Sequence, residues 1–201
     1  MKSRELENVL CIPTSEATKE LAQNWSIPLT CLDDNSVIDV AIDGADEVDQ
    51  PHLNLVKGRG GALLREKLVA EASKVFVVVT DISKMQSVGL GTSGAFPVEI
   101  IQFCHKHIIR NILSLPSLPA SKKGVLRMKD KSGDNIPYVT DNGNFIVDLF
   151  FDQALEDAPQ VAAELTNVVG VVEHGLFLDM TTAVVVATNE DVNCIWKTNA
   201  P

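Results

Sequence analysis

The stretch that decides the fold reads Val37-Ile38-Asp39-Val40-Ala41-Ile42-Asp43-Gly44. Its apolar part is short and rich in β-branched residues, which predicts a strand that Asp43 and Gly44 end. A second apolar run, Val75–Thr80, predicts the clearest buried strand of the chain, and a helix over about Ala62–Ala72 separates the two. Strand, helix and strand in this order predict a parallel sheet that helices cover.

The flanking segments extend this pattern in both directions. Short strands are expected over residues 9–12, 27–30 and 53–56, and a last buried strand over 183–188 is expected to rejoin the first sheet. A helix to about Gln23 begins after Thr14 or Ser15, and either hydroxyl would supply the cap oxygen.

After Phe96 the pattern changes. A strand from Pro97 and a helix with apolar residues at three- and four-residue spacing come first. Two strands, 138–140 and 145–149, then flank Asn142-Gly143, which is a strong hairpin signal. A helix over 158–165 and a strand over 170–172 complete a β-α-β-β-α-β order. That order is typical of a ferredoxin-like α+β unit.

Composition excludes several classes of protein. The chain has 201 residues, of which 45% are hydrophobic and 22% charged, as in an ordinary globular protein of one or two domains. The net charge of -10 disfavours nucleic acid and anionic membranes as partners, while a cleft could still take a small anionic substrate. The start of the sequence has no apolar stretch typical of a secretory signal. Four widely spaced cysteines indicate reduced thiols in an intracellular protein.

The histidines do not indicate a metal site. His105 and His107 have no cysteine or carboxylate at ligand spacing, and their segment has helical periodicity. We therefore expect surface or capping histidines and no bound metal.

Acidic residues are concentrated in one segment. Residues 31–50 hold seven acids and neither lysine nor arginine; the acids are Asp33, Asp34, Asp39, Asp43, Asp46, Glu47 and Asp49. In open α/β sheets, ligands bind at the carboxyl ends of strands, where Asp43 and Asp46 are expected. Crowded carboxylates there would raise at least one pKa, which suits proton transfer. A solvated turn and a magnesium site stay open as alternatives, although no P-loop motif accompanies the acids.

A glycine-rich turn follows eight residues later. Lys57-Gly58-Arg59-Gly60-Gly61 precedes a predicted helix, so its backbone N–H groups and the lysine could hold an anion. Glu66 lies one turn inside that helix. We expect an apolar face of Leu64, Leu68 and Ala72 to point away from Glu66, which leaves Glu66 facing solvent or the cleft. An ordinary surface loop is the alternative.

With these motifs the sequence resembles the ribose-5-phosphate isomerase type A family. The resemblance runs from about Asn8 to Thr188 and rests on segments in the family's order, namely 43–47, 57–67, 80–84, 96–99 and 139–144. It implies an α/β fold in which a Rossmann-like parallel sheet carries an inserted ferredoxin-like domain. The expected Rossmann-like domain comprises residues 1–96 and 175–201, and the small domain comprises 97–174.

The resemblance also implies an activity: interconversion of ribose 5-phosphate and ribulose 5-phosphate through an enediolate, in the pentose phosphate pathway, without a cofactor. Glu66 matches the family's base, Asp43 and Asp46 its carboxylates for ring opening and proton shuttling, and Lys57 its enediolate stabiliser. The residues expected to bind substrate are Gly44, Ala45, Gly58, Arg59, Gly60, Gly61 and Lys84. Ser83 is a weaker candidate near the site.

One departure from the family's pattern affects the expected activity. The Gly-Thr-Gly-Ser-Thr loop that holds the substrate phosphate in the family does not precede Val9. Gly91-Thr92-Ser93-Gly94 is not counted as that loop. We therefore expect weak binding of ribose 5-phosphate, with Lys57, Arg59 and Lys84 in partial compensation. The alternative is a non-catalytic sugar-phosphate sensor or scaffold. A homo-oligomer in the cytoplasm is expected, or in a plastid if a transit peptide precedes this sequence.

Overall fold

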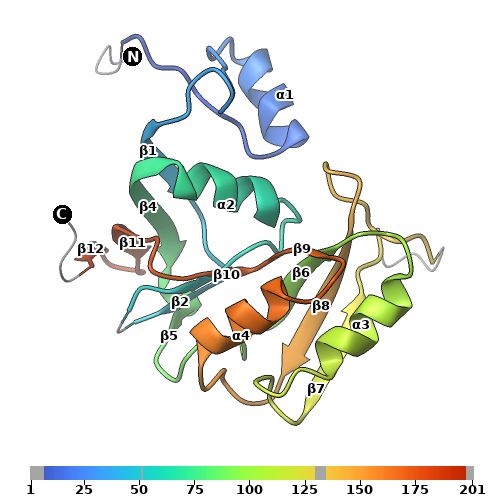
Figure 1. Cartoon of the computed structure of the whole chain (residues 1–201). Coiled ribbons are helices and arrows are strands. Elements are labelled where there is room, and N and C mark those ends of the chain that lie inside the picture. The colour runs from blue at the N-terminus through green and yellow to red at the C-terminus, as the bar shows by residue number, and fades with distance from the viewer. Residues whose placement is uncertain (1–6, 51, 130–134, 198–201) are drawn as a thin grey trace.

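The computed structural model describes residues 7–50, 52–129 and 135–197. Its first sheet has the order β1-β4-β11-β12 and contains β1 (Ile38–Asp43), β4 (Ser73–Asp81), β11 (Ala183–Ala187) and β12 (Val192–Trp196). The first three strands are parallel, as the apolar runs predict, and β12 joins antiparallel to β11. Helix α2 (Leu63–Glu71) connects β1 to β4 through two short strands and lies beside the sheet (Figure 1).

A second sheet, built from very short strands, lies next to the first. Its order is β10-β3-β2-β5, with β10 (Leu176–Phe177), β3 (Leu55–Val56), β2 (Glu47–Asp49) and β5 (Met85–Gln86). Only β3 falls within a predicted strand. Strands of two or three residues contain too few side chains for a period-2 pattern to be visible in the sequence. This sheet matters for function because Lys57 follows directly from β3.

The third sheet has the predicted ferredoxin-like order. It is antiparallel, in the order β7-β8-β6-β9, and consists of β6 (Phe96–Ile100), β7 (Lys122–Leu126), β8 (Phe145–Phe151) and β9 (Val171–His174). Helices α3 (His105–Leu113) and α4 (Ala158–Thr166) pack on one face, where Ile108, Ile112, Val161 and Leu165 join the apolar core (Figure 1). That core also includes Val56, Leu90 and Leu176, so the division at residues 96 and 174 stays a prediction.

The second strand of this sheet was predicted in the wrong place. Residues 138–140 belong to the described chain and are not a strand; β8 pairs with β7 instead. The lysine-rich start of β7, Lys122-Lys123, conceals its strand character in the sequence. The turn itself forms, because Thr140 N–H donates to the Asn144 carbonyl and Gly143 adopts a φ of 78°.

The N-terminal segment contains helix α1 (Glu16–Asn24). The Ser15 hydroxyl accepts a hydrogen bond from Thr18 N–H at 3.0 Å, which makes Ser15 the cap. The strands predicted over 9–12 and 27–30 reduce to one parallel bridge between Cys11 and Leu29, because Pro13 and Pro28 interrupt both runs. Among the described residues, no helix has the length and apolar character needed to cross a bilayer.

The inward face of α2 differs from the prediction. Leu63 and Ala70 are its buried residues, whereas Leu68 is 46% exposed. Glu66 and Lys67 lie at positions i+3 and i+4 from Leu63, so they share the inward stripe. The apolar pattern does not reveal this face, because it includes the charged residues Glu66 and Lys67, which form ion pairs inside the protein.

Candidate active site

Lys57 lies at the centre of the site. Its side chain is only 3% exposed, and its Nζ lies 2.9 Å from Asp43 Oδ2 and 3.5 Å from Glu66 Oε2. The ammonium also donates to the Gly44 carbonyl at 2.5 Å and lies 5.5 Å from the centre of the Phe177 ring. One buried cation therefore joins the end of β1 to the first turn of α2.

A pocket of about 180 Å³ opens beside this lysine. The residues that line it are Asp43, Gly44, Ala45, Asp46, Lys57, Gly58, Gly60 and Glu66. The pocket brings together all four residues predicted to be catalytic and four of the seven predicted to bind substrate. Arg59, Gly61 and Lys84 are outside the set of described residues that line it.

The two aspartates are held by backbone N–H groups. Asp43 is the last residue of β1, and its Oδ1 accepts from Gly44 N–H at 2.7 Å. Asp46 follows in the turn, and its Oδ2 accepts from Arg59 N–H at 2.9 Å. The second bond ties the acidic turn to the glycine-rich turn, so both carboxylates have fixed places beside the pocket.

Glu66 has the electrostatic character of a proton acceptor. Burial raises the pKa of its carboxyl above 4.5, the Lys57 ammonium opposes that rise, and the charges of Asp43 and Asp46 add to it. Its Oε2 is buried and has no hydrogen bond to any described residue. A carboxylate with a raised pKa that lines a pocket is suited to accept a proton from a bound molecule.

Arg59 does not add positive charge to the pocket, contrary to expectation. Its guanidinium donates to Glu47 Oε1 at 2.9 Å, to the Ala95 carbonyl at 2.9 Å and to Ser93 Oγ at 3.1 Å. Glu47 is fully buried and also accepts from the N–H groups of Gly91 and Ser93. The arginine therefore holds the glycine-rich turn to residues 91–95, and only its backbone reaches the site.

The other predicted residues have different surroundings. Gly61 packs against the Tyr138 hydroxyl so closely that a Cβ there would lie 2.3 Å from it. Hydrogen bonds from Ser83 lower the pKa of Asp81, and the charge of Lys84, the last residue of the 3₁₀ helix Ile82–Lys84, adds to this effect. Ser83 donates to the same aspartate. Nothing in the described part of the chain groups three or more His, Cys, Asp or Glu side chains as metal ligands.

Sequence reasoning missed several residues around the site. Phe177 lies beneath Lys57, the Gly175 carbonyl accepts from Lys57 N–H at 2.9 Å, and Arg127 contacts the glycine-rich turn. These residues come from β10, the segment before it and the segment after β7. No local signal marks them, because each acts through a contact made across more than 65 residues of sequence.

Fold and site together define a class: an α/β protein whose pocket is equipped for proton transfer on a small polar molecule. The family model described as ribose 5-phosphate isomerase A (phosphoriboisomerase A) matches residues 10–191. The chain therefore belongs to the ribose 5-phosphate isomerase A family, which confirms the resemblance seen in the motifs.

Individual relatives agree. "Probable ribose-5-phosphate isomerase 3, chloroplastic" of Arabidopsis thaliana is 48% identical over 198 residues, which are 98% of this chain and 70% of the relative. The solved ribose 5-phosphate isomerase from Plasmodium falciparum is 40% identical with a TM-score of 0.90, covering 96% of this chain and 80% of that one. A solved D-ribose-5-phosphate isomerase in complex with phospho-erythronic acid is 38% identical with a TM-score of 0.86, over 96% and 80% of the two chains.

Proposed function

We propose that the pocket interconverts ribose 5-phosphate and ribulose 5-phosphate by moving a proton between C1 and C2 of the open-chain sugar. The observation that carries this proposal is the position of Glu66, buried with a raised pKa and 3.5 Å from the Lys57 ammonium. The names of the relatives support the choice of substrate. The phospho-erythronic acid bound in a solved relative supports a small phosphorylated ligand.

The reaction begins when the Glu66 carboxylate takes the proton from C2 of the aldose. The electron pair of the broken C–H bond forms the C1–C2 double bond, and the carbonyl oxygen O1 becomes an oxyanion. The Lys57 ammonium stabilises that charge, which exists only along the reaction path. Protonation of O1 and loss of the proton from O2 carry the enediol forward, and the protonated Glu66 returns its proton to C1.

The two aspartates serve the oxygen atoms. Asp43 and Asp46 lie on the rim shared with Lys57, and we assign them to ring opening and to proton exchange at O1 and O2. Backbone groups of Gly44, Ala45, Gly58 and Gly60 hold the sugar, since these residues line the same pocket. Lys84 remains a proposed ligand for the phosphate.

A coupled assay on the 201-residue chain tests the proposal. Ribose 5-phosphate is converted to ribulose 5-phosphate in the expected result, and unphosphorylated ribose reacts much more slowly. Adding a segment with the family's phosphate loop should raise the turnover, because binding energy from the phosphate helps to orient the reacting carbons. Saturable binding of ribose 5-phosphate without product would favour the sensor or scaffold instead. Absence of both binding and turnover would reject both functions.

Two further predictions concern the oligomeric state of the protein and its location in the cell. A homodimer is expected, and the mass in solution measures it. We keep the cytoplasm as the expected location, and the chloroplastic name of the Arabidopsis relative supports a plastid as the alternative.

A further inference from the structure

The glycine-rich turn is held by Arg127, an arginine that the mechanism does not use and that follows an edge strand of the third sheet, β7-β8-β6-β9, called the small sheet below. Arg127 follows β7, and its Nη1 donates to the carbonyls of Gly58 at 3.3 Å and Arg59 at 3.0 Å. The rest of the guanidinium is paired with Asp148 on β8, through Nε at 2.8 Å and Nη2 at 2.5 Å. Both side chains are largely buried, so this fork has a fixed direction.

The contact of Arg127 with the Gly58 carbonyl affects the direction of the next N–H group, which faces the pocket side of the turn. In a trans peptide unit the C=O and N–H bonds point in opposite directions. Because the Gly58 carbonyl points to Arg127, the N–H of the same unit, which belongs to Arg59, points away from it and donates to Asp46. Asp46 thus owes one of its hydrogen bonds to the direction of the Gly58–Arg59 peptide.

The Arg59–Gly60 peptide unit is oriented in the same way. The Arg59 carbonyl also accepts from Arg127, so the N–H of Gly60 points away from the small sheet. Gly60 lines the pocket, and its N–H has no acceptor among the residues the structure describes. A free N–H in this place is a donor for an oxygen of a bound sugar, most valuably for an oxyanion.

Packing around Arg127 fixes the fork further. Its guanidinium lies 5.8 Å from the centre of the Tyr138 ring, and the Tyr138 hydroxyl contacts Gly61 at the end of the same turn. The turn is therefore held from the small sheet at Gly58, Arg59 and Gly61, and from residues 91–95 through the Arg59 side chain. Within the turn, Gly61 N–H also donates to the Gly58 carbonyl at 2.9 Å, so this bond and Arg127 together orient the Gly58–Arg59 peptide. The Arg59 carbonyl accepts only from Arg127 among the described residues, so the Arg59–Gly60 peptide depends on Arg127.

We propose that Arg127 is a positioning residue for the reaction: it orients the Gly58–Gly60 peptides so that Arg59 N–H holds Asp46 and Gly60 N–H faces the substrate. Its effect on turnover rests on the proposed function, whereas its effect on the backbone does not. A buried Arg127–Asp148 pair that only joins the two parts of the chain is the competing explanation, and it would affect stability alone.

The experiment compares R127M and R127K with R110M, a matched change at an exposed arginine on α3. We expect R127M to lower kcat about 10-fold or more, since small displacements of catalytic groups are costly, with KM changed less than about threefold. R127K should fall between R127M and the wild type. R110M should match the wild type. A folded R127M with kcat within twofold of wild type overturns the proposal, and a change confined to KM reassigns Arg127 to substrate binding.

A second measurement does not depend on activity. Hydrogen exchange at the Arg59 amide, followed by NMR, should be about 10-fold faster in R127M because its bond to Asp46 loosens. Unchanged exchange at the Arg59 amide overturns the proposal for Arg127, whether or not the chain is active. A wild-type chain without isomerase activity would count against the proposed function alone. If R127M does not fold, R127K and D148N test the proposal by kcat and by hydrogen exchange at the Arg59 amide. D148N keeps the arginine but weakens its anchor, so we expect about a threefold loss of kcat and faster exchange at Arg59.

Discussion

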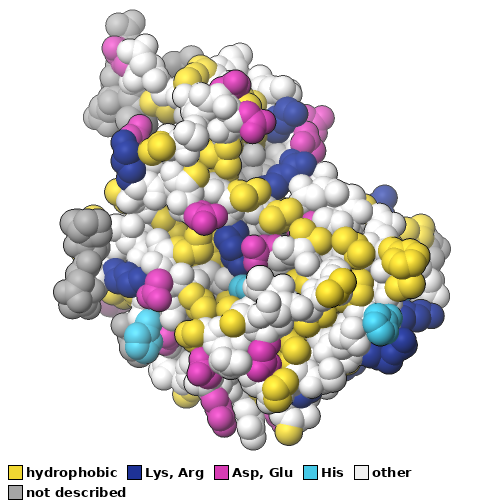
Figure 2. Space-filling model, in the orientation of Figure 1, with side chains coloured by type: hydrophobic (Ala, Val, Ile, Leu, Met, Phe, Trp, Pro, Cys, Tyr) yellow, Lys and Arg dark blue, Asp and Glu magenta, His cyan; other side chains and the backbone are white. Residues whose placement is uncertain are grey.

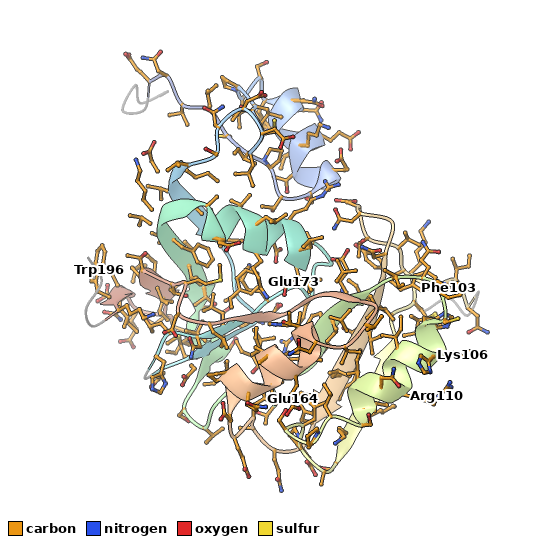
Figure 3. The ribbon with its side chains drawn as sticks, viewed as in Figure 1. Phe103, Lys106, Arg110, Glu164, Glu173 and Trp196 are labelled. Carbon is orange, nitrogen blue, oxygen red and sulfur yellow. The ribbon has the colours of Figure 1, made fainter. Side chains whose placement is uncertain are left out.

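Two buried lysines lie over the same aromatic ring and have different surroundings. Lys57 Nζ is 5.5 Å and Lys67 Nζ is 5.0 Å from the centre of the Phe177 ring. Lys57 faces the pocket, where Asp43 and Glu66 lie within 3.5 Å of its Nζ. Lys67 lies between α2 and β9, where it contacts Glu173 at 2.6 Å and donates to the His174 carbonyl at 2.7 Å. Figure 3 shows Glu173 just below α2, and Figure 2 shows acidic and basic side chains together there.

The difference lies in the balance of charge. Lys67 and Glu173 are one cation and one anion; burial lowers the pKa of the lysine, and the carboxylate of Glu173 opposes that change. At the pocket, three carboxylates surround one ammonium, which leaves an excess of negative charge that helps to raise the pKa of Glu66. The balanced pair joins structural elements, whereas the unbalanced cluster has a carboxylate ready to take up a proton.

Removing the proton acceptor should produce the largest effect. In Glu66→Gln the amide has nearly the same shape but cannot accept the C2 proton, so kcat should fall about 10²–10⁴-fold. Circular dichroism should show an unchanged fold, and loss of a buried charge should leave the free energy of unfolding equal or higher. A variant that retains a tenth of wild-type turnover would exclude Glu66 as the base.

Replacing each lysine by methionine tests the difference between Lys57 and Lys67 directly. Lys57→Met should lower kcat about 10²-fold with a smaller change in KM, because an enediolate stabiliser acts mainly on the transition state. Since Lys57 lowers the pKa of Glu66, the acid limb of the pH–rate profile should also move to higher pH. A raised KM with unchanged kcat would instead make Lys57 a ligand for the phosphate.

The matched change on the other side of the ring should affect stability. Lys67→Met leaves Glu173 partly buried without its cation, so the free energy of unfolding should fall by about 1–3 kcal/mol. Isomerase kcat should stay within about threefold of wild type. Urea unfolding measures the loss, and Lys74→Met, which breaks an exposed pair with Asp39, should leave the free energy of unfolding nearly unchanged. Equal losses of activity in Lys57→Met and Lys67→Met would show that the two lysines do not differ in their role in catalysis.

His174 gives the finest test of the balanced pair, through a dependence of stability on pH that leaves activity aside. Burial, and then the Lys67 charge, lower the pKa of His174 to about 4, while Glu173 opposes them. Below about pH 6.5 the unfolded chain binds a proton that the folded chain does not. Stability is therefore fully present above pH 6.5 and declines towards pH 4, by up to about 1.4 kcal/mol per pH unit.

Unfolding measured between pH 4 and 7 checks this dependence. His174→Gln should show a flatter profile, and the exposed His107→Gln should keep the wild-type slope. Lys67→Met should shorten the sloping range, because one cause of the low pKa is removed. A wild-type slope in His174→Gln would show that another group is responsible.

The sequence predicted what depends on neighbouring residues. The run Val37–Ile42 and the run Val75–Thr80 became β1 and β4 because β-branched residues favour strands. The expected burial on both faces was wrong, because Val40, Ile42 and Val79 are exposed on one face of the sheet. The four proposed catalytic residues were predicted to meet because the acidic turn and the glycine-rich turn border one α/β unit. Their convergence on one pocket follows from local order along the chain.

The remaining features depend on distant partners. Glu66 faces the cleft as expected, but the buried stripe of α2 was not predicted. Its charged members Glu66 and Lys67 pair with Lys57, which follows β3, and with Glu173 on β9, and the helix sequence does not reveal these partners. Strand β7 was missed because only its pairing with β8 makes a lysine-rich segment a strand. Arg127 and Phe177 have no local pattern that points to the site. Long-range pairing thus accounts for most of what sequence reasoning lacked.

The Phe177 ring beneath Lys57 has a consequence for the order of events during translation. The ribosome makes Lys57 about 120 residues before Phe177, which is roughly 6–24 s at ~5–20 residues per second. Until then, the lysine lacks both the ring and the Gly175 carbonyl that accepts its N–H. The nascent chain can make β1, α2 and the residues that line the pocket early, but Lys57 gains the Gly175 carbonyl and the Phe177 ring only after residues 175–177 have emerged.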